Sequence, residues 1–88
     1  MMSICDEIDM KLGTFGADSI FQKARSLSYE ERQLVDELFR QALVGKDLDI
    51  RAAEKISGVS VRRVERKIPD LRRRLEIALE LAQRGKLA

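Results

Sequence analysis

The sequence contains no histidine and no tryptophan, a single cysteine (Cys5) and a single proline (Pro69). Without histidine, the chain lacks the commonest general base and the commonest metal ligand of enzymes. One cysteine supports neither an internal disulfide nor a zinc site, and no glycine-rich phosphate-binding loop occurs. We therefore expect a protein that is not an enzyme and needs no cofactor, with Cys5 as a small buried hydrophobic residue.

Long hydrophobic runs are also missing. No apolar stretch approaches the ~18 residues that a membrane-spanning helix needs, and the N-terminal residues do not resemble a secretory signal. Together with the low cysteine content, this predicts a cytoplasmic protein without a membrane partner. The acidic stretch at residues 6–9 could coordinate a cation, although a solvated face is the simpler interpretation.

The net charge of +2 conceals an uneven distribution along the 88 residues. Residues 1–49 carry six Lys and Arg against ten Asp and Glu, a net charge of −4, whereas residues 50–88 carry eleven against five, a net charge of +6. An excess of positive charge in one half of a chain indicates a polyanionic partner for that half. Nucleic-acid-binding residues are therefore expected in the second half.

Hydrophobic residues recur at helical spacing almost throughout, and alternating β-branched runs are absent. The predicted fold class is all-α: one domain spanning residues 1–88, a small helical bundle of four to five helices that contains a helix-turn-helix and no wing. The expected parts are two short helices within residues 1–26 (about 3–12 and 17–26), a support helix at 28–44, the helix-turn-helix at 49–68 and a C-terminal helix at 70–84.

A capping box predicts the start of the support helix. Ser28 is followed three residues later by Glu31, so that each side chain can accept a hydrogen bond from a backbone N–H that the helix start leaves free. Gly45 is a suitable terminator at the other end. The residues between them that form one apolar, core-facing side are Leu34, Val35, Leu38, Phe39, Ala42 and Leu43.

Residues 49–68 are predicted to form two short helices joined by a turn. Asp49 is a good N-cap for the first helix, Gly58 interrupts it, and Ser60 caps the second. Such a pair, joined by a short glycine-containing turn, is typical of a helix-turn-helix. The residues expected on the inward side are Ile50, Ala53 and Ile56 in the first helix and Val61, Val64 and Ile68 in the second.

The second short helix is left with a basic outward side. In a helix-turn-helix this helix enters the major groove of duplex DNA, and arginine can donate two hydrogen bonds to guanine there. The arginines after Pro69 are expected to contact phosphates, which position a protein without specifying sequence. The predicted DNA-binding residues are Ser60, Arg62, Arg63, Arg66, Lys67, Arg72, Arg73 and Arg74.

Residues 27–75 resemble the helix-turn-helix of region 4 of bacterial sigma factors and of related response-regulator output domains. The resemblance implies a sequence-specific, double-stranded DNA-binding transcriptional regulator. It rests on the opening phrase Glu31-Arg32-Gln33-Leu34-Val35, the turn Gly58-Val59-Ser60, the apolar residues Val64 and Ile68 after the glycine, and the closing run Arg72-Arg73-Arg74-Leu75.

Two features depart from that pattern. The family places a small alanine four residues before the turn glycine, but Glu54 occupies that position here and Ala53 lies one step earlier. Either Ser57 is looped out of a longer turn, or the two helices cross at another place. At Pro69, which has no backbone N–H, we expect a break with the proline opening a new helix; a kinked single helix is the alternative.

The C-terminal helix carries more apolar surface than one packing contact needs. A heptad-like stripe continues from the second short helix into it, and its apolar side spans about 200° instead of the ~100° typical of a surface helix. The excess is expected to form a homodimer, with cover by the N-terminal helices as the alternative. The expected interface residues are Leu75, Ile77, Ala78, Leu79, Leu81 and Ala82.

Two functions fit these features. The first is a small transcriptional regulator that reads duplex DNA, for which a two-fold dimer would suit palindromic half-sites. The second is a helical protein-interaction adaptor whose basic face meets an acidic partner, such as RNA polymerase or another regulator. A basic outward side directly after the capped turn is required by the first function and not by the second.

Overall fold

The computed structural model describes Met10 and residues 20–84. No strand occurs among these residues, so the expected all-α fold class is confirmed for them. Most of the helix expected at residues 3–12 lies outside the described residues, as do the cation-binding stretch at 6–9 and Cys5. The described helices are α2 (Ile20–Ala24), α3 (Tyr29–Leu43), α4 (Ile50–Ser57), α5 (Val61–Glu65) and α6 (Leu71–Gln83).

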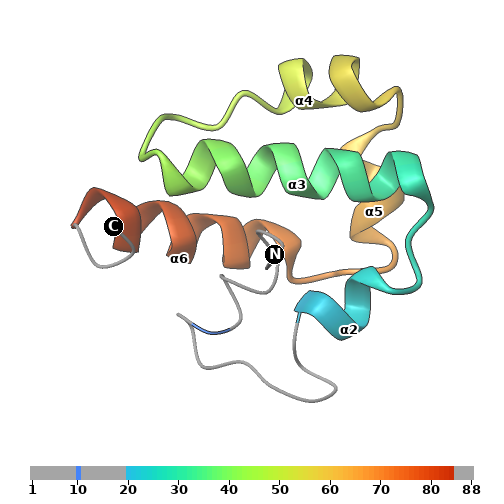
Figure 1. The fold of residues 1–88 in the computed structure, drawn as a ribbon, viewed down its shortest axis with the longest axis horizontal. Helices are drawn as coiled ribbons and strands as arrows, with labels where there is room; N and C mark the ends of the chain where they lie inside the picture. Colours follow the sequence, from blue (N-terminus) through green and yellow to red (C-terminus); the bar gives the residue numbers. More distant parts are fainter. Residues whose placement is uncertain (1–9, 11–19, 85–88) are drawn as a thin grey trace.

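Helix α3 is the centre of the fold (Figure 1). Helix α4 packs along one side of it, α6 runs in the same direction along another, and α5 lies at its N-terminal end. The core forms where the apolar sides of these helices meet, and burial of one large apolar side chain contributes about 1.5–3 kcal/mol. The largest apolar residues in this core are Phe39, Leu34, Leu38, Ile68, Leu71 and Leu75.

The capping box at the start of α3 is confirmed. Ser28 N donates to Glu31 Oε1 at 2.7 Å, and Glu31 N donates to Ser28 Oγ at 3.2 Å. Beyond the other end of α3, Gly45 has a φ of 75°, the left-handed conformation that glycine adopts readily. The loop that follows is held by Gln41, whose Oε1 accepts from Asp49 N at 2.7 Å. Helix α4 therefore starts from a fixed point beside α3.

The two short helices and the turn expected at residues 49–68 are present. Asp49 Oδ1 accepts from Ala52 N at 3.0 Å and caps α4. Gly58 ends α4 with a φ of 80°, and its N–H donates to Glu54 O at 2.8 Å. Ser60 Oγ then accepts from Arg63 N at 3.4 Å, which caps α5. The two helices are separated by Gly58, Val59 and Ser60 alone.

The buried side of α4 differs from the prediction at one position. Ala53 is fully buried and Ile50 packs against the core, but Ile56 is 64% exposed. Ser57 takes the inward position instead, and its hydroxyl donates to Ala53 O at 2.9 Å. Since Ser57 is the last residue of α4, it is not looped out of the turn. The fully buried alanine of α4 is therefore Ala53, five residues before the glycine.

The break at Pro69 is confirmed, although its position is shifted. Helix α5 ends at Glu65, and the N–H groups of Lys67 and Ile68 both donate to Val64 O at 2.9 Å. Because Pro69 has no N–H, it cannot continue this turn. Helix α6 begins at Leu71, so the expectation that Pro69 is the first residue of the new helix is wrong.

Part of the predicted dimer interface is wrong. Leu75 and Ala78 are 1% and 0% exposed, because both lie in the seam between α6 and α3. They are therefore covered by the chain itself and are not available to a second copy. The other predicted interface residues are half-buried, with Leu79 also packed against the core: Ile77, Leu79, Leu81 and Ala82. No described helix is long and apolar enough to cross a membrane.

Candidate nucleic-acid interface

Four cationic side chains surround α5 and the turn that follows it: Arg62, Arg63, Arg66 and Lys67. We call these four residues the cationic face. All four are exposed, while Val61 and Val64 of the same helix are buried in the core. Residues four apart lie on the same side of a helix, so Arg62 groups with Arg66 and Arg63 with Lys67. The inward and outward sides of α5 are thus those predicted from the sequence.

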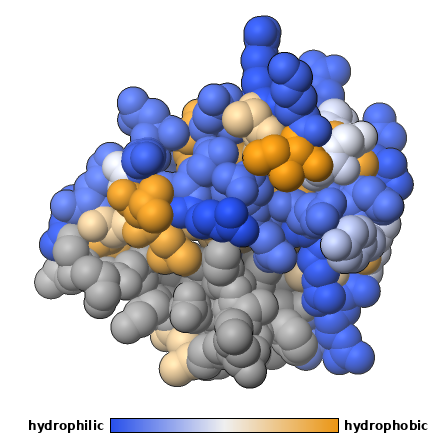
Figure 2. All heavy atoms as spheres, turned by 45° about the horizontal axis from the view of Figure 1, so that its top comes forward, coloured by the Kyte–Doolittle hydropathy of each residue, from blue (hydrophilic) through white to orange (hydrophobic). Residues whose placement is uncertain are grey.

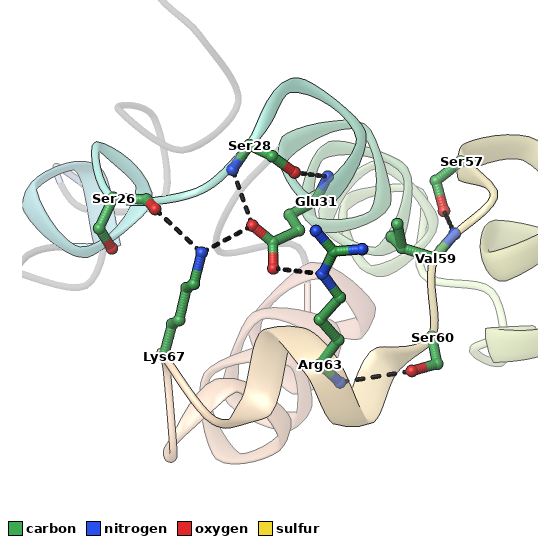
Figure 3. A network of polar contacts seen from close by, with 8 residues as sticks. All are labelled: Ser26, Ser28, Glu31, Ser57, Val59, Ser60, Arg63 and Lys67. Atoms are coloured by element: carbon green, nitrogen blue, oxygen red, sulfur yellow. Dashed lines mark hydrogen bonds and ion pairs between the residues drawn. The ribbon is translucent and has the colours of Figure 1, made fainter.

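The second pair is held by one buried acid, Glu31 of α3 (Figure 3). Glu31 Oε2 accepts from Arg63 Nε at 3.2 Å, and Oε1 accepts from Lys67 Nζ at 2.9 Å. Lys67 Nζ also donates to Ser26 O at 3.2 Å. Although the Glu31 side chain is 0% exposed, those of Arg63 and Lys67 remain 57% and 42% exposed. This network connects Arg63 and Lys67 of the cationic face to the N-terminal end of α3.

Glu31 is a stable anion in this setting. The hydrogen bond from the Ser28 backbone and the hydrogen bond from Lys67 lower its pKa from 4.5 to about 2, although burial acts in the opposite direction. The carboxylate therefore stays charged at neutral pH and keeps both cations in place. Sequence reasoning assigned Glu31 only to the capping box and missed its two cationic partners, because they lie 32 and 36 residues further along the chain.

The first pair is unpartnered within the described segments. Neither Arg62 nor Arg66 forms an ion pair with any acidic side chain of Met10 or residues 20–84. Their guanidinium groups are exposed and carry charges that no described acid balances. The cationic face thus contains two tethered cations and two that are available to an external anion.

The start of α5 is capped twice. Besides the Ser60 hydroxyl, Glu54 Oε2 accepts from Val61 N at 2.8 Å. Glu54 stands where the family that the chain resembles has a small alanine. The glutamate therefore supplies a second acceptor for the free N–H groups at the start of α5. The sequence signal was an acid seven residues before the first residue of α5, which sequence reasoning did not recognise.

The three arginines at the start of α6 have different surroundings. Arg73 is exposed and has no acidic partner among the described residues, whereas Arg72 Nε donates to Glu65 Oε1 at 2.9 Å. Arg74 is 7% exposed, and its Nε donates to Asp70 Oδ2 at 2.8 Å. The structure therefore corrects the expectation that Arg74 contacts phosphate: its side chain lies on the inward side of α6.

Asp70 also joins α2 to α6. Its Oδ1 accepts from Lys23 Nζ at 3.4 Å, in addition to the bond from Arg74. Burial opposes ionisation of this carboxyl, but the ion pairs with Arg74 and Lys23 outweigh that effect and hold its pKa below the usual value. Asp70 thus fixes the start of α6 next to the break at Pro69.

A groove of about 430 Å³ lies between α3 and α4, and no residue of the cationic face lines it. Its apolar residues are Tyr29 and Ile56, 72% and 64% exposed, and its polar lining includes Arg32 and Asp36. The face of the molecule in Figure 2 is mainly hydrophilic, and its apolar areas are separate patches. No cluster of three potential metal ligands occurs in the part of the chain that the structure describes.

Comparisons with protein-family models, with curated proteins and with solved structures found no match to this chain. The resemblance to sigma-factor region 4 and response-regulator output domains therefore stays a prediction.

Proposed function

We propose that this chain is a small transcriptional regulator that binds duplex DNA in a sequence-specific manner, with α4 as the supporting helix and α5 as the reading helix. The observation that carries the proposal is the cationic face directly after a capped three-residue turn, in which Arg62 and Arg66 have no acidic partner in the described segments. The N-terminal residues of a reading helix lie closest to base edges in the major groove. Such a regulator would act in the cytoplasm.

The proposal assigns different contacts to different cations. Arg63 is assigned to base edges, because it lies in the first turn of α5 and its side chain is 57% exposed. Arg62, Arg66 and Arg73 are assigned to phosphates, since each is exposed and lacks an acidic partner among the described residues. Ser60 remains a candidate contact at the start of the helix, although its hydroxyl already accepts from Arg63 N.

Salt dependence of DNA binding tests this function. The three arginines without an acidic partner among the described residues, together with the half-exposed Lys67, would neutralise about three to four phosphates. Log affinity should therefore fall with log salt concentration with a slope of about −2.7 to −3.6. The experiment titrates a duplex pool and single selected duplexes at four salt concentrations. Phosphate contacts are strongest at low salt, so an absence of binding at about 50 mM salt would refute the proposal.

Single substitutions test the division of contacts. Arg63→Ala should relax base preference, whereas Arg73→Ala should weaken binding to all sequences alike and reduce the salt slope by about 0.9. Arg84→Ala is the control, because Arg84 is also exposed but lies at the far end of α6, paired with Glu80. If Arg63→Ala and Arg73→Ala lower the affinity for preferred and scrambled duplexes by the same factors, the assignment of Arg63 to bases and Arg73 to phosphates is wrong.

A homodimer is the second part of the proposal. It is supported by the half-buried apolar residues of α6 that the core does not fully cover, Ile77, Leu79, Leu81 and Ala82. Sedimentation equilibrium with and without DNA tests it, and Ile77→Glu should shift the mass toward the monomer. A monomer at high protein concentration, in both free and DNA-bound samples, would contradict this part alone.

A protein-interaction adaptor is the second candidate function. The observation that favours it is the groove between α3 and α4, where Tyr29 and Ile56 expose apolar surface. Exposed apolar residues rimmed by charged ones are typical of protein contacts. RNA polymerase or another regulator would be the partner. Loss of partner binding on Ile56→Asp, combined with no affinity for DNA, would support the adaptor over the regulator.

A further inference from the structure

We propose that Glu31 is a positioning residue for base recognition: it holds the Arg63 guanidinium in the orientation that reads DNA. This inference rests on the proposed DNA-binding function. Glu31 belongs to α3 and is fully buried, so it cannot touch DNA itself. Any effect of Glu31 on sequence preference must therefore pass through the residues that it binds.

The two carboxylate oxygens of Glu31 have separate tasks. Oε1 accepts from Ser28 N and Lys67 Nζ, at 2.7 and 2.9 Å, and so completes the capping box and anchors the turn after α5. Oε2 accepts from Arg63 Nε at 3.2 Å. Capping of α3 thus needs only one oxygen, and the other is directed at the arginine (Figure 3).

The site of attachment on Arg63 matters. Because the carboxylate binds at Nε, the two terminal nitrogens form no hydrogen bond with an acid among the described residues, and the side chain as a whole is 57% exposed. Arginine recognises guanine with two parallel N–H donors in a fixed plane. An arginine whose plane is already held loses less side-chain freedom on binding, which favours the matching base over others.

The neighbouring arginines provide the contrast. Arg62 and Arg66 make no ion pair with the described residues, so nothing comparable fixes their orientation. Mobile cations suit phosphate contacts, which do not depend on a single geometry. Glu31 carries one negative charge and pairs with two cations, Arg63 and Lys67, so the three side chains together keep a net charge of +1.

Glu31→Gln separates the two tasks. Glutamine can keep the acceptor for Ser28 N, since capping boxes use either residue, but its amide nitrogen cannot accept from Arg63 Nε. The ratio of affinities for the preferred duplex and a scrambled duplex should fall by about tenfold. This is near the lower end of the discrimination that one bidentate base contact provides. Affinity for the scrambled duplex should stay the same or rise, because a negative charge is removed near the DNA.

A double-mutant cycle excludes a merely structural effect. If Glu31 acts through Arg63, Glu31→Gln should not lower the affinity ratio further in an Arg63→Gln background. Lower stability alone would reduce both affinities by the same factor and leave the ratio unchanged. Circular dichroism at the assay temperature checks that each variant is folded.

A measurement on the unaltered protein covers the case in which Glu31→Gln does not fold. The Arg63 Nε–H resonance in free protein should exchange with water more slowly and show a higher order parameter than that of Arg62. Equal values, or an unchanged affinity ratio in Glu31→Gln, overturn the positioning role while DNA binding stands. A wild-type chain that binds no DNA overturns the proposed function and this inference together.

Discussion

Substitution of Gly58 measures how strictly the turn between α4 and α5 requires a left-handed residue. Gly58 has a φ of 80°, and a Cβ built at this position would meet no atom within 4 Å. A side chain therefore causes no clash, and the cost of Gly58→Ala is the backbone cost of the left-handed conformation, about 1–2 kcal/mol. For a domain of this size, 1 kcal/mol corresponds to a fall in Tm of about 4–8 °C.

Urea unfolding followed by circular dichroism gives the free energy of unfolding for this comparison. Gly58→Asn is the matched control, since asparagine visits the left-handed region with a smaller penalty than alanine and is also expected to meet open space. The expected order of stability is Gly58, then Asn, then Ala. An alanine variant as stable as the wild type, within about 0.3 kcal/mol, would show that the turn does not hold this conformation.

Three further variants address the core, the buried acid and the second cap of α5. Leu38→Ala should lower the free energy of unfolding by about 2–5 kcal/mol in urea, because Leu38 is fully buried, whereas Ile56→Ala should change it by less than about 0.5 kcal/mol. The pKa of Glu31 is lowered from 4.5 to about 2, so the charged carboxylate stabilises the fold fully above about pH 4.5, and this stabilisation is lost as the pH falls toward 2. Urea unfolding midpoints measured across this pH range should show the loss in the wild type and a smaller loss in Glu31→Gln. Glu54→Ala should destabilise the protein by about 1 kcal/mol in thermal unfolding, since Val61 N loses an acceptor, while Glu80→Ala at an exposed position should have little effect.

The helix ends were predictable because they depend on residues close in sequence. Ser28 and Glu31 form the capping box across three residues, and Asp49 and Ser60 each cap the helix that follows them. Gly58 ends α4 because its own backbone conformation allows it. Each of these features is determined locally, so one sequence is enough to recognise it.

The predictions that failed concern contacts between distant segments. The periodicity of α4 placed Ile56 inward, but Ile56 and Ser57 lie three and four residues after Ala53, and the helical period allows either spacing. Tertiary packing selected Ser57. Likewise, Arg74 was grouped with Arg72 and Arg73 by adjacency, although consecutive helical residues point about 100° apart and Arg74 faces inward to Asp70. Adjacency in sequence does not define a face of a helix.

Helix α5 has only five residues, and isolated helices shorter than about 12 residues are marginal in water. Its formation therefore depends on contacts from other elements: Glu54 and Ser60 satisfy its first N–H groups, Val61 and Val64 anchor it in the core, and Glu31 holds Arg63. Two of these five residues, Glu31 and Glu54, are buried or half-buried acids that lie outside α5 itself. The placement of α5 and the orientation of Arg63 thus depend in part on acidic residues of α3 and α4, namely Glu31 and Glu54. It follows that neutralising Glu31 or Glu54 should alter the proposed reading of DNA more than it alters the total charge of the protein.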